Sequence, residues 1–104
     1  MLKPFAAAVV LTAALSGCRP VTPCSAAVAA IFPLSQQVKA QAVVWRESRG
    51  NPAARGPGGA SGCFQLLGHA DLIPGGAGAR FDAVANVTGA FRLWQGSGWK
   101  AWGG

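Results

Sequence analysis

Acidic residues and histidine are scarce in this sequence, and tyrosine is absent from it. Its 104 residues contain three acids and one histidine, His69. The three cysteines and His69 lack the paired spacing of zinc ligands, so we expect no metal site and no cofactor. Nine lysines and arginines give a net charge of +6, but they form no basic run and no aromatic-basic motif. We therefore expect an anionic polymer outside the cell as the partner, and not nucleic acid.

The apolar run near the N-terminus, residues 5–15, is too short to span a bilayer, which takes about 20 residues. It follows Lys3, and this order predicts a secretory signal peptide. The next residues complete the sequence LSGC at positions 15–18, which resembles the lipobox of bacterial lipoproteins. We expect a signal peptide over residues 1–17 and a lipid on Cys18, the first mature residue, which anchors an exported protein in the cell envelope. The alternative is a plain secretory signal cut near the same position, which would give a secreted protein.

The cysteines allow more than one pairing. If Cys18 carries a lipid, Cys24 and Cys63 remain as an even pair in an oxidising compartment, which favours a disulfide. Two unpaired thiols are an alternative, as is a bond between Cys18 and Cys24 in a chain without the lipid. The sequence alone does not choose among these pairings.

The mature chain has the composition of a small, mainly α domain with long loops rich in glycine and proline, and no β-alternating run or internal repeat is present. Residues 18–33 are expected to form an extended tether and a short helix over residues 26–32, which Pro33 ends. Residues 34–104 form the main domain. Its loops are expected at residues 51–62 and 68–80.

Two helices are predicted in the main domain from apolar spacing. The first covers residues 34–48, and its core-facing stripe is expected to contain Leu34, Val38, Ala42 and Trp45. The second begins after Asp82, the expected N-cap, and ends near Gly96 and Gly98. Its core-facing stripe is expected to contain Val84, Val87, Phe91 and Trp94.

Glu47 is the only glutamate, and it falls in the last turn of the first helix. The helix dipole disfavours a carboxylate at this end. The residues on the same helix face are apolar: Val44, Val43 and Ala40. Both effects favour a protonated carboxyl, the form that a general acid at a glycosidic oxygen needs. Arg46 and Arg49 would oppose this effect, but we expect them to contribute less because they project from other sides of the helix. The alternative is a solvated glutamate at a fraying helix end.

Two ordered motifs carry a family resemblance. ESRGNP at residues 47–52 and GASGCFQL at residues 59–66 resemble the first two motifs of the soluble lytic transglycosylases of the lysozyme superfamily, with Cys63 at a position usually held by leucine. FDAVANVTGAFRLW at residues 81–94 resembles a later helix of that family, and SGWKAW at residues 97–102 resembles the closing segment of its small phage and actinobacterial members. The family's third motif contains a tyrosine, and this chain has none.

The resemblance implies a small lysozyme-like domain that binds peptidoglycan strands as a monomer. It also implies cleavage of the β-1,4 bond between N-acetylmuramic acid and N-acetylglucosamine, with Glu47 acting alone as acid and then base. By family position Ser48 and Gln65 would contact sugar, and the alternatives are a local backbone bond for Ser48 and a solvated Gln65. Asn86 is a further candidate contact, although ordering the loop beside Glu47 suits it better.

Aromatic side chains are the remaining candidates for contact with sugar. Phe64, Trp99 and Trp102 could stack on sugar rings, and Trp102 is the one most expected to be exposed. The alternative is that all three belong to the core, as aromatic residues in so small a domain usually do.

Two other functions remain open from the sequence. Asp71 is the only credible second carboxylate, and if it faces Glu47 across a cleft, simple hydrolysis is favoured. Alternatively, the chain is a peptidoglycan-binding lipoprotein without turnover, or a structural envelope lipoprotein whose motif match is accidental.

Overall fold

The computed structural model describes residues 19–104. The predicted signal peptide and the lipidation site Cys18 lie outside the described residues. Three α-helices are present in this part of the chain: α2 (Pro23–Ile31), α3 (Gln37–Ser48) and α4 (Ala83–Ser97). The remaining elements are short 3₁₀ turns: η1 (Leu34–Gln36), η2 (Pro57–Gly59), η3 (Ala70–Leu72), η4 (Gly76–Ala79) and η5 (Lys100–Trp102).

The described residues contain no β-strand, and only two isolated β-bridges, Arg55 with Ser61 and Ser61 with Leu66, are present among them. The predicted mainly α class with long loops is therefore confirmed. None of the helices described for residues 19–104 has the length and apolar content needed to cross a membrane.

Helix α2 begins earlier than the sequence indicated. Thr22 is its N-cap, with Pro23 in the first turn, and Thr22 and Ser25 cap each other's backbone N–H groups reciprocally. This capping box starts the helix three residues before position 26, so the extended tether is shorter than expected. The helix is also shorter at its other end, where Ile31 is its last residue.

Helix α3 confirms the prediction of a helix over residues 34–48, with a first turn of 3₁₀ type. The predicted core-facing stripe is wrong. Leu34 and Val38 are 88% and 85% exposed, Ala42 is exposed, and Trp45 is half-buried. The face that packs into the core contains Ala40, Val43 and Val44 instead. The helix carries two apolar stripes, and packing against α2 and the central loop selects the one with the smaller side chains.

Helix α4 begins as predicted. The Asp82 carboxylate accepts a hydrogen bond from the Ala85 backbone N–H at 2.9 Å, and Gly98 caps the C-terminus. Val87 is fully buried, whereas Phe91 and Trp94 pack against the core while partly exposed. Val84 was expected to face the core and is 59% exposed, so that part of the stripe is wrong.

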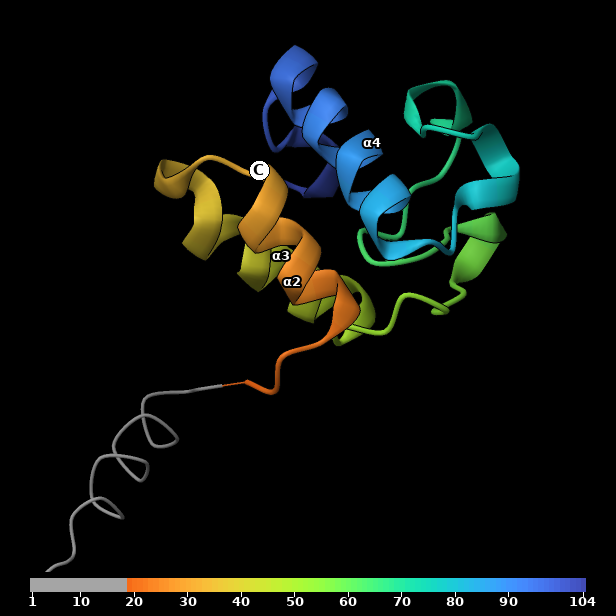
Figure 1. Cartoon of the computed structure of the whole chain (residues 1–104). Helices are drawn as coiled ribbons and strands as arrows, with labels where there is room; N and C mark the ends of the chain where they lie inside the picture. Colours follow the sequence, from red (N-terminus) through yellow and green to blue (C-terminus); the bar gives the residue numbers. More distant parts are fainter. Residues whose placement is uncertain (1–18) are drawn as a thin grey trace, which may run out of the picture.

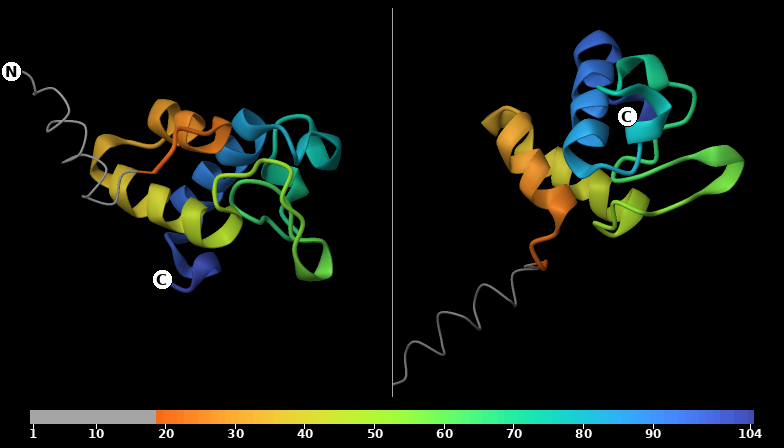
Figure 2. Two further views of the ribbon diagram at one scale, coloured as in Figure 1. Left: turned by 90° about the horizontal axis from the view of Figure 1, so that it is seen from below. Right: turned by 45° about the vertical axis from the view of Figure 1, so that its right-hand side comes forward.

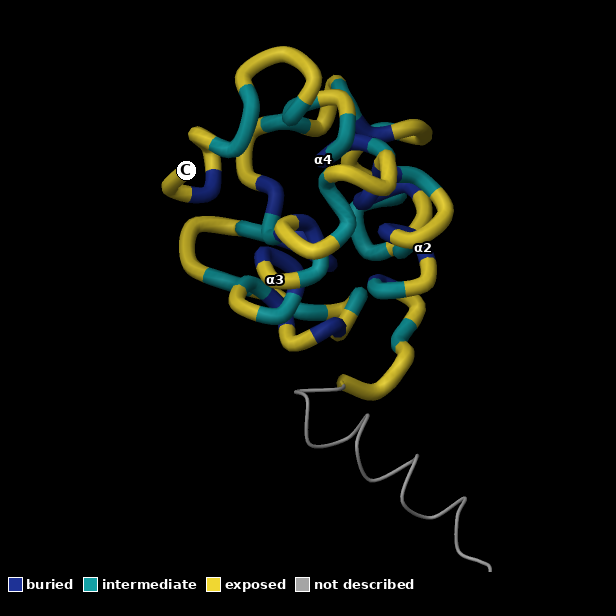
Figure 3. The backbone as a smooth tube through the Cα atoms, turned by 90° about the vertical axis from the view of Figure 1, so that its left-hand side faces the viewer, coloured by how far each residue is buried: buried dark blue, intermediate teal, exposed yellow. Residues whose placement is uncertain are grey.

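The helices and the loops lie on different sides of the molecule. Helix α4 packs mainly against α2, which also contacts α3. Residues 50–82, green to cyan in Figures 1 and 2, fill the side away from α2 and α3. Figure 3 shows buried and exposed positions alternating along the helices and long exposed stretches in the loops. At the end of α3 the chain leaves the helical side and enters the loop side.

An aromatic cluster fills the core between these parts. Phe32 lies at its centre, with ring centroids 5.3 to 6.0 Å from those of Phe64, Phe91, Trp94 and Trp99. Trp102 extends the cluster, 5.5 Å from Phe64 and 5.4 Å from Trp99. The interpretation of Phe64 and Trp99 as core residues therefore agrees with their positions.

Candidate functional site

Ser48 joins the end of α3 to the second motif, residues 59–66. Arg49 adopts a left-handed conformation (φ 55°) that ends the helix directly after Ser48. The Ser48 hydroxyl lies 2.8 Å from the carbonyl oxygen of Cys63 and accepts a hydrogen bond from the Gly50 N–H at 3.2 Å. Ser48 is only 7% exposed. Its expected contact with sugar is therefore corrected, because the hydroxyl is buried and used to join the two motifs.

Asn86 holds the second motif from the other side. Its side chain is fully buried on α4. The Oδ1 atom accepts a hydrogen bond from the Phe64 N–H, and Nδ2 donates to the carbonyl oxygens of Ser61 and Arg80, all at 2.9 Å. The substrate contact assigned to Asn86 is corrected for the same reason, since every polar group of the amide is bonded to backbone. The structure agrees with the other interpretation, in which Asn86 orders the loop.

Gly62 is required by this arrangement. Its φ is +77°, and a Cβ atom there would collide with the Asn86 amide and with the Arg80 carbonyl oxygen. A glycine therefore allows the loop to approach α4 closely enough for Asn86 to bond it.

A disulfide joins the second motif to α2. The Cys24 and Cys63 sulfur atoms are bonded, their Cα atoms are 5.5 Å apart, and both residues are fully buried. This is the first of the pairings that the sequence left open. The second motif is thus attached to all three helices: by the disulfide to α2, by Ser48 to α3 and by Asn86 to α4.

Glu47 projects from this junction and is partly shielded. Its side chain is 27% exposed, and its Oε2 atom lies 3.3 Å from both Nε and Nη2 of Arg46. Arg46 also donates a hydrogen bond to the Trp102 carbonyl oxygen. The side chains of Arg46 and Glu47 are therefore in contact, although adjacent residues project from different sides of a helix. The adjacency of the two residues in the sequence was the available signal for this contact.

A small hollow lies beside the junction. Its volume is about 80 Å³, and it is lined by residues of the second motif and its neighbours, by Leu93, and by the C-terminal residues Ala101 and Trp102. Gln65 lines it while its amide nitrogen donates to the carbonyl oxygens of Ala54 and Gly62. Glu47 is not part of the lining and is connected to it through Arg46 and Trp102.

Trp102 is not the exposed aromatic platform that was expected. It is 9% exposed, and its indole N–H donates a hydrogen bond to the Phe64 carbonyl oxygen at 2.9 Å. Its ring packs in the aromatic cluster. The prediction that Trp102 stacks on sugar is therefore corrected. Trp102 is a buried residue that packs against Phe64 of the second motif.

The two aspartates have separate positions. Asp82 is used as the α4 cap. Asp71 is exposed on η3, which packs against α4 and η4. Within residues 19–104 no three histidine, cysteine or acidic side chains come together in a way that could hold a metal ion.

Comparison of the chain with protein-family models, with curated proteins and with solved structures gives no match in any of the three. The resemblance to lytic transglycosylases stays an expectation from the sequence motifs.

Proposed function

We propose that this protein is an exported cell-wall enzyme that cleaves the β-1,4 bond between N-acetylmuramic acid and N-acetylglucosamine in peptidoglycan, with Glu47 as its general acid and base. The observation that supports this proposal most directly is the junction around Ser48. It holds the two motif segments together and leaves Glu47 partly exposed at the end of α3, while the Cys24–Cys63 disulfide attaches the second motif to α2. A catalytic carboxyl needs this kind of rigid support.

The reaction needs one carboxyl group. Protonated Glu47 donates its proton to the glycosidic oxygen as the bond from that oxygen to the muramyl C1 breaks. The resulting carboxylate then takes the proton of the muramyl C6 hydroxyl while O6 bonds to C1. This forms a 1,6-anhydro ring and restores the protonated Glu47, without consuming water. Between the two proton transfers the Arg46 guanidinium, 3.3 Å away, stabilises the carboxylate.

Of the two other acids, one has a structural role, which leaves a single candidate for a second carboxylate. A two-carboxylate glycosidase needs a partner carboxylate across the cleft at a defined separation. Asp82 caps α4. Asp71 is exposed on η3, a short turn that packs against α4. Hydrolysis with Asp71 as second carboxylate is the alternative proposal, and the ends of the released muropeptides distinguish the two reactions.

A specific observation supports a second candidate function, a peptidoglycan-binding protein without turnover. The hollow beside the junction has a volume of about 80 Å³, whereas small-molecule sites usually have ~300–1,000 Å³. A disaccharide would fit only along the open surface. Weak surface binding to glycan strands, through the basic residues of the chain, is compatible with this shape.

The decisive experiment compares wild type with Glu47→Gln, as processed by an exporting host, on purified peptidoglycan. Release of soluble muropeptides is followed by mass spectrometry. We expect 1,6-anhydro ends from wild type and a loss of about 10²- to 10⁴-fold in Glu47→Gln, the usual contribution of a general acid-base group. Asp71→Asn, which changes the other candidate carboxyl, is the matched control and should release fragments at the wild-type rate.

Three other outcomes would contradict the proposal. Equal release by wild type and Glu47→Gln removes Glu47 from catalysis. Reducing ends in place of anhydro ends, together with loss of activity in Asp71→Asn, indicate hydrolysis. Sedimentation of wild-type protein with cell walls, without release of fragments, indicates a binding protein.

A further inference from the structure

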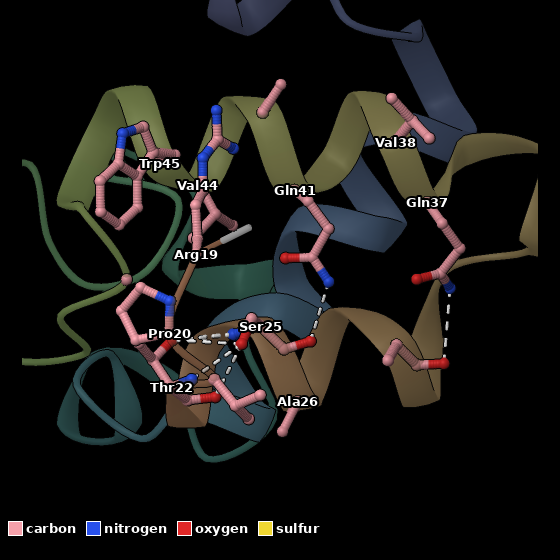
Figure 4. Close-up of a pocket in the computed structure, with 14 residues that line it drawn as sticks. Arg19, Pro20, Thr22, Ser25, Ala26, Gln37, Val38, Gln41, Val44 and Trp45 are labelled. Carbon is pink, nitrogen blue, oxygen red and sulfur yellow. Dashed lines mark hydrogen bonds between the residues drawn. The ribbon is translucent and has the colours of Figure 1, made fainter. Parts of the chain in front are cut away.

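A second, larger depression lies between α2 and α3, away from Glu47. Its volume is about 620 Å³, within the range of ~300–1,000 Å³ that is typical of ligand sites. Figure 4 shows the two helices as its walls, with Arg19, Pro20 and Trp45 at one end and Gln37 and Val38 at the other. We refer to it as the α2–α3 groove.

The α2–α3 groove is lined mainly by apolar side chains. Ala26 and Ala29 line it on the α2 side, and Val38 and Ala42 line it on the α3 side. Val38 is 85% exposed and Val21, at the entrance, is 86% exposed. Val38 and Ala42 are apolar side chains that the sequence assigned to the core and that the folded chain leaves exposed. A hollow of this volume with a mainly apolar lining is typical of a ligand site.

The polar groups on the groove floor are already bonded. The Gln41 side-chain amide donates to the Ser25 carbonyl oxygen at 2.9 Å, and the Gln37 amide donates to the Ala29 carbonyl oxygen at 3.4 Å (Figure 4). No acidic residue is among the described residues that line the groove. The floor therefore suits a hydrocarbon chain better than a sugar, whose hydroxyl groups need hydrogen-bond partners.

Positive charge gathers at one end of the groove. The guanidinium groups of Arg19 and Arg49 lie over the Trp45 ring, 5.1 and 5.4 Å from its centroid. Trp45 itself lines the groove and is half-buried. An indole ring flanked by two cations next to an apolar surface is the arrangement expected where a protein meets the headgroups of an anionic membrane.

The path of the chain brings this end to the membrane. Arg19 lines the groove, and the next residue toward the N-terminus is Cys18, the predicted lipidation site, one peptide unit or about 3.8 Å away. A lipid on Cys18 would therefore hold the groove entrance at the bilayer surface. This argument depends on the predicted anchor, and it does not depend on the role of Glu47.

We propose that the α2–α3 groove binds an acyl chain of an anionic membrane phospholipid, with the phosphate beside Arg19 and Arg49. The lipid covers Val21 and Val38 and docks the domain on the membrane in one orientation. The same groove could receive a helix of another protein or a second copy of this chain. The basic end and its position next to the anchor favour phospholipid over both.

The test uses the full chain, processed by an exporting host, reconstituted in phosphatidylcholine vesicles that contain phosphatidylglycerol with brominated acyl chains. Bromine quenches tryptophan fluorescence on contact, and Trp45→Phe provides the background from the three other tryptophans. We expect quenching of the Trp45 emission, and less quenching when the bromine is on phosphatidylcholine. Val38→Glu should reduce Trp45 quenching at least tenfold, because its carboxylate would have to be desolvated in the groove.

Val84→Glu is the matched control, since Val84 is an exposed valine on α4 that lies outside the groove. It should be quenched like wild type. Equal quenching in wild type and Val38→Glu would overturn the proposal, as would the absence of Trp45 quenching. A dimer of the detergent-free protein that Val38→Glu dissociates would overturn it in favour of a second copy of the chain.

Discussion

Glu47 and Ser48 are neighbours in the chain with opposite environments. The Glu47 carboxylate is partly open to solvent and paired with Arg46, whereas the Ser48 hydroxyl is buried between Val44, Gly50 and Cys63. One residue is therefore available for chemistry, and the next holds it in place.

At the residue scale, we predict that Ser48→Ala weakens the fold without touching substrate. The substitution leaves the buried Gly50 N–H and Cys63 carbonyl without their partner, which should lower the free energy of unfolding by about 1–3 kcal/mol. Urea denaturation measures the change. Ser97→Ala is the control, because the exposed Ser97 hydroxyl bonds only the Leu93 carbonyl oxygen within its own helix. Equal midpoints for the two variants would contradict the structural role of Ser48.

At the scale of elements, local signals were predictable and packing choices were not. The Asp82 cap was predictable because it depends on residues within one turn. The start of α2 was missed because Ser25 completes its capping box where glutamate or glutamine is the usual signal. The buried face of α3 was predicted wrongly because both of its apolar stripes have helical spacing, and only the contacts with α2 and the second motif distinguish them.

The candidate site was likewise predictable only in its local features. The motifs identified Glu47 and the two segments that meet there. They did not show that Ser48, Asn86 and Trp102 are buried, because burial depends on how α4 and the C-terminal turn pack over the second motif. Hydroxyl and amide groups suited to sugar are equally suited to backbone, and the sequence does not reveal which of the two they bind.

Two glycines of α4 give a prediction at this scale. A Cβ on Gly89 would lie 2.9 Å from Cγ1 of Ile73, and 3.3 Å from Cδ1 of Leu66, whereas a Cβ on Gly96 would meet no atom within 4 Å. Gly96→Ala should stabilise the protein by up to about 1 kcal/mol through helix propensity. Gly89→Ala should destabilise it by about 1–3 kcal/mol, because it overpacks the contact with η3. Thermal unfolding of both variants measures the difference, and a stabilised Gly89→Ala would show that α4 and η3 are not closely packed.

At the scale of the whole molecule, a disulfide cross-link joins the helical side to the loop side. The Cys24–Cys63 disulfide closes a loop with a sequence separation of 39. For a loop of this length the chain-entropy relation gives a stabilisation of about 4 kcal/mol. We predict that Cys24→Ala/Cys63→Ala lowers the free energy of unfolding by about this amount, measured in urea.

Reduction of the wild type by dithiothreitol should have a similar effect, and the double variant, which has no bond to break, is the control. An unchanged urea midpoint of the wild type after reduction would show that the bond does not stabilise the domain.

The disulfide also sets an order of events in the life of the chain. Small domains retain only about 5–15 kcal/mol of stability in total, so the thiol form inside the cell lacks a large share of it. If the chain is exported as we propose, this loosely folded form would suit passage through a secretion channel, and the bond would form after transport, in an oxidising compartment. In the exported enzyme that we propose, the junction beside Glu47 would thereby be completed only outside the cell, and activity would begin there.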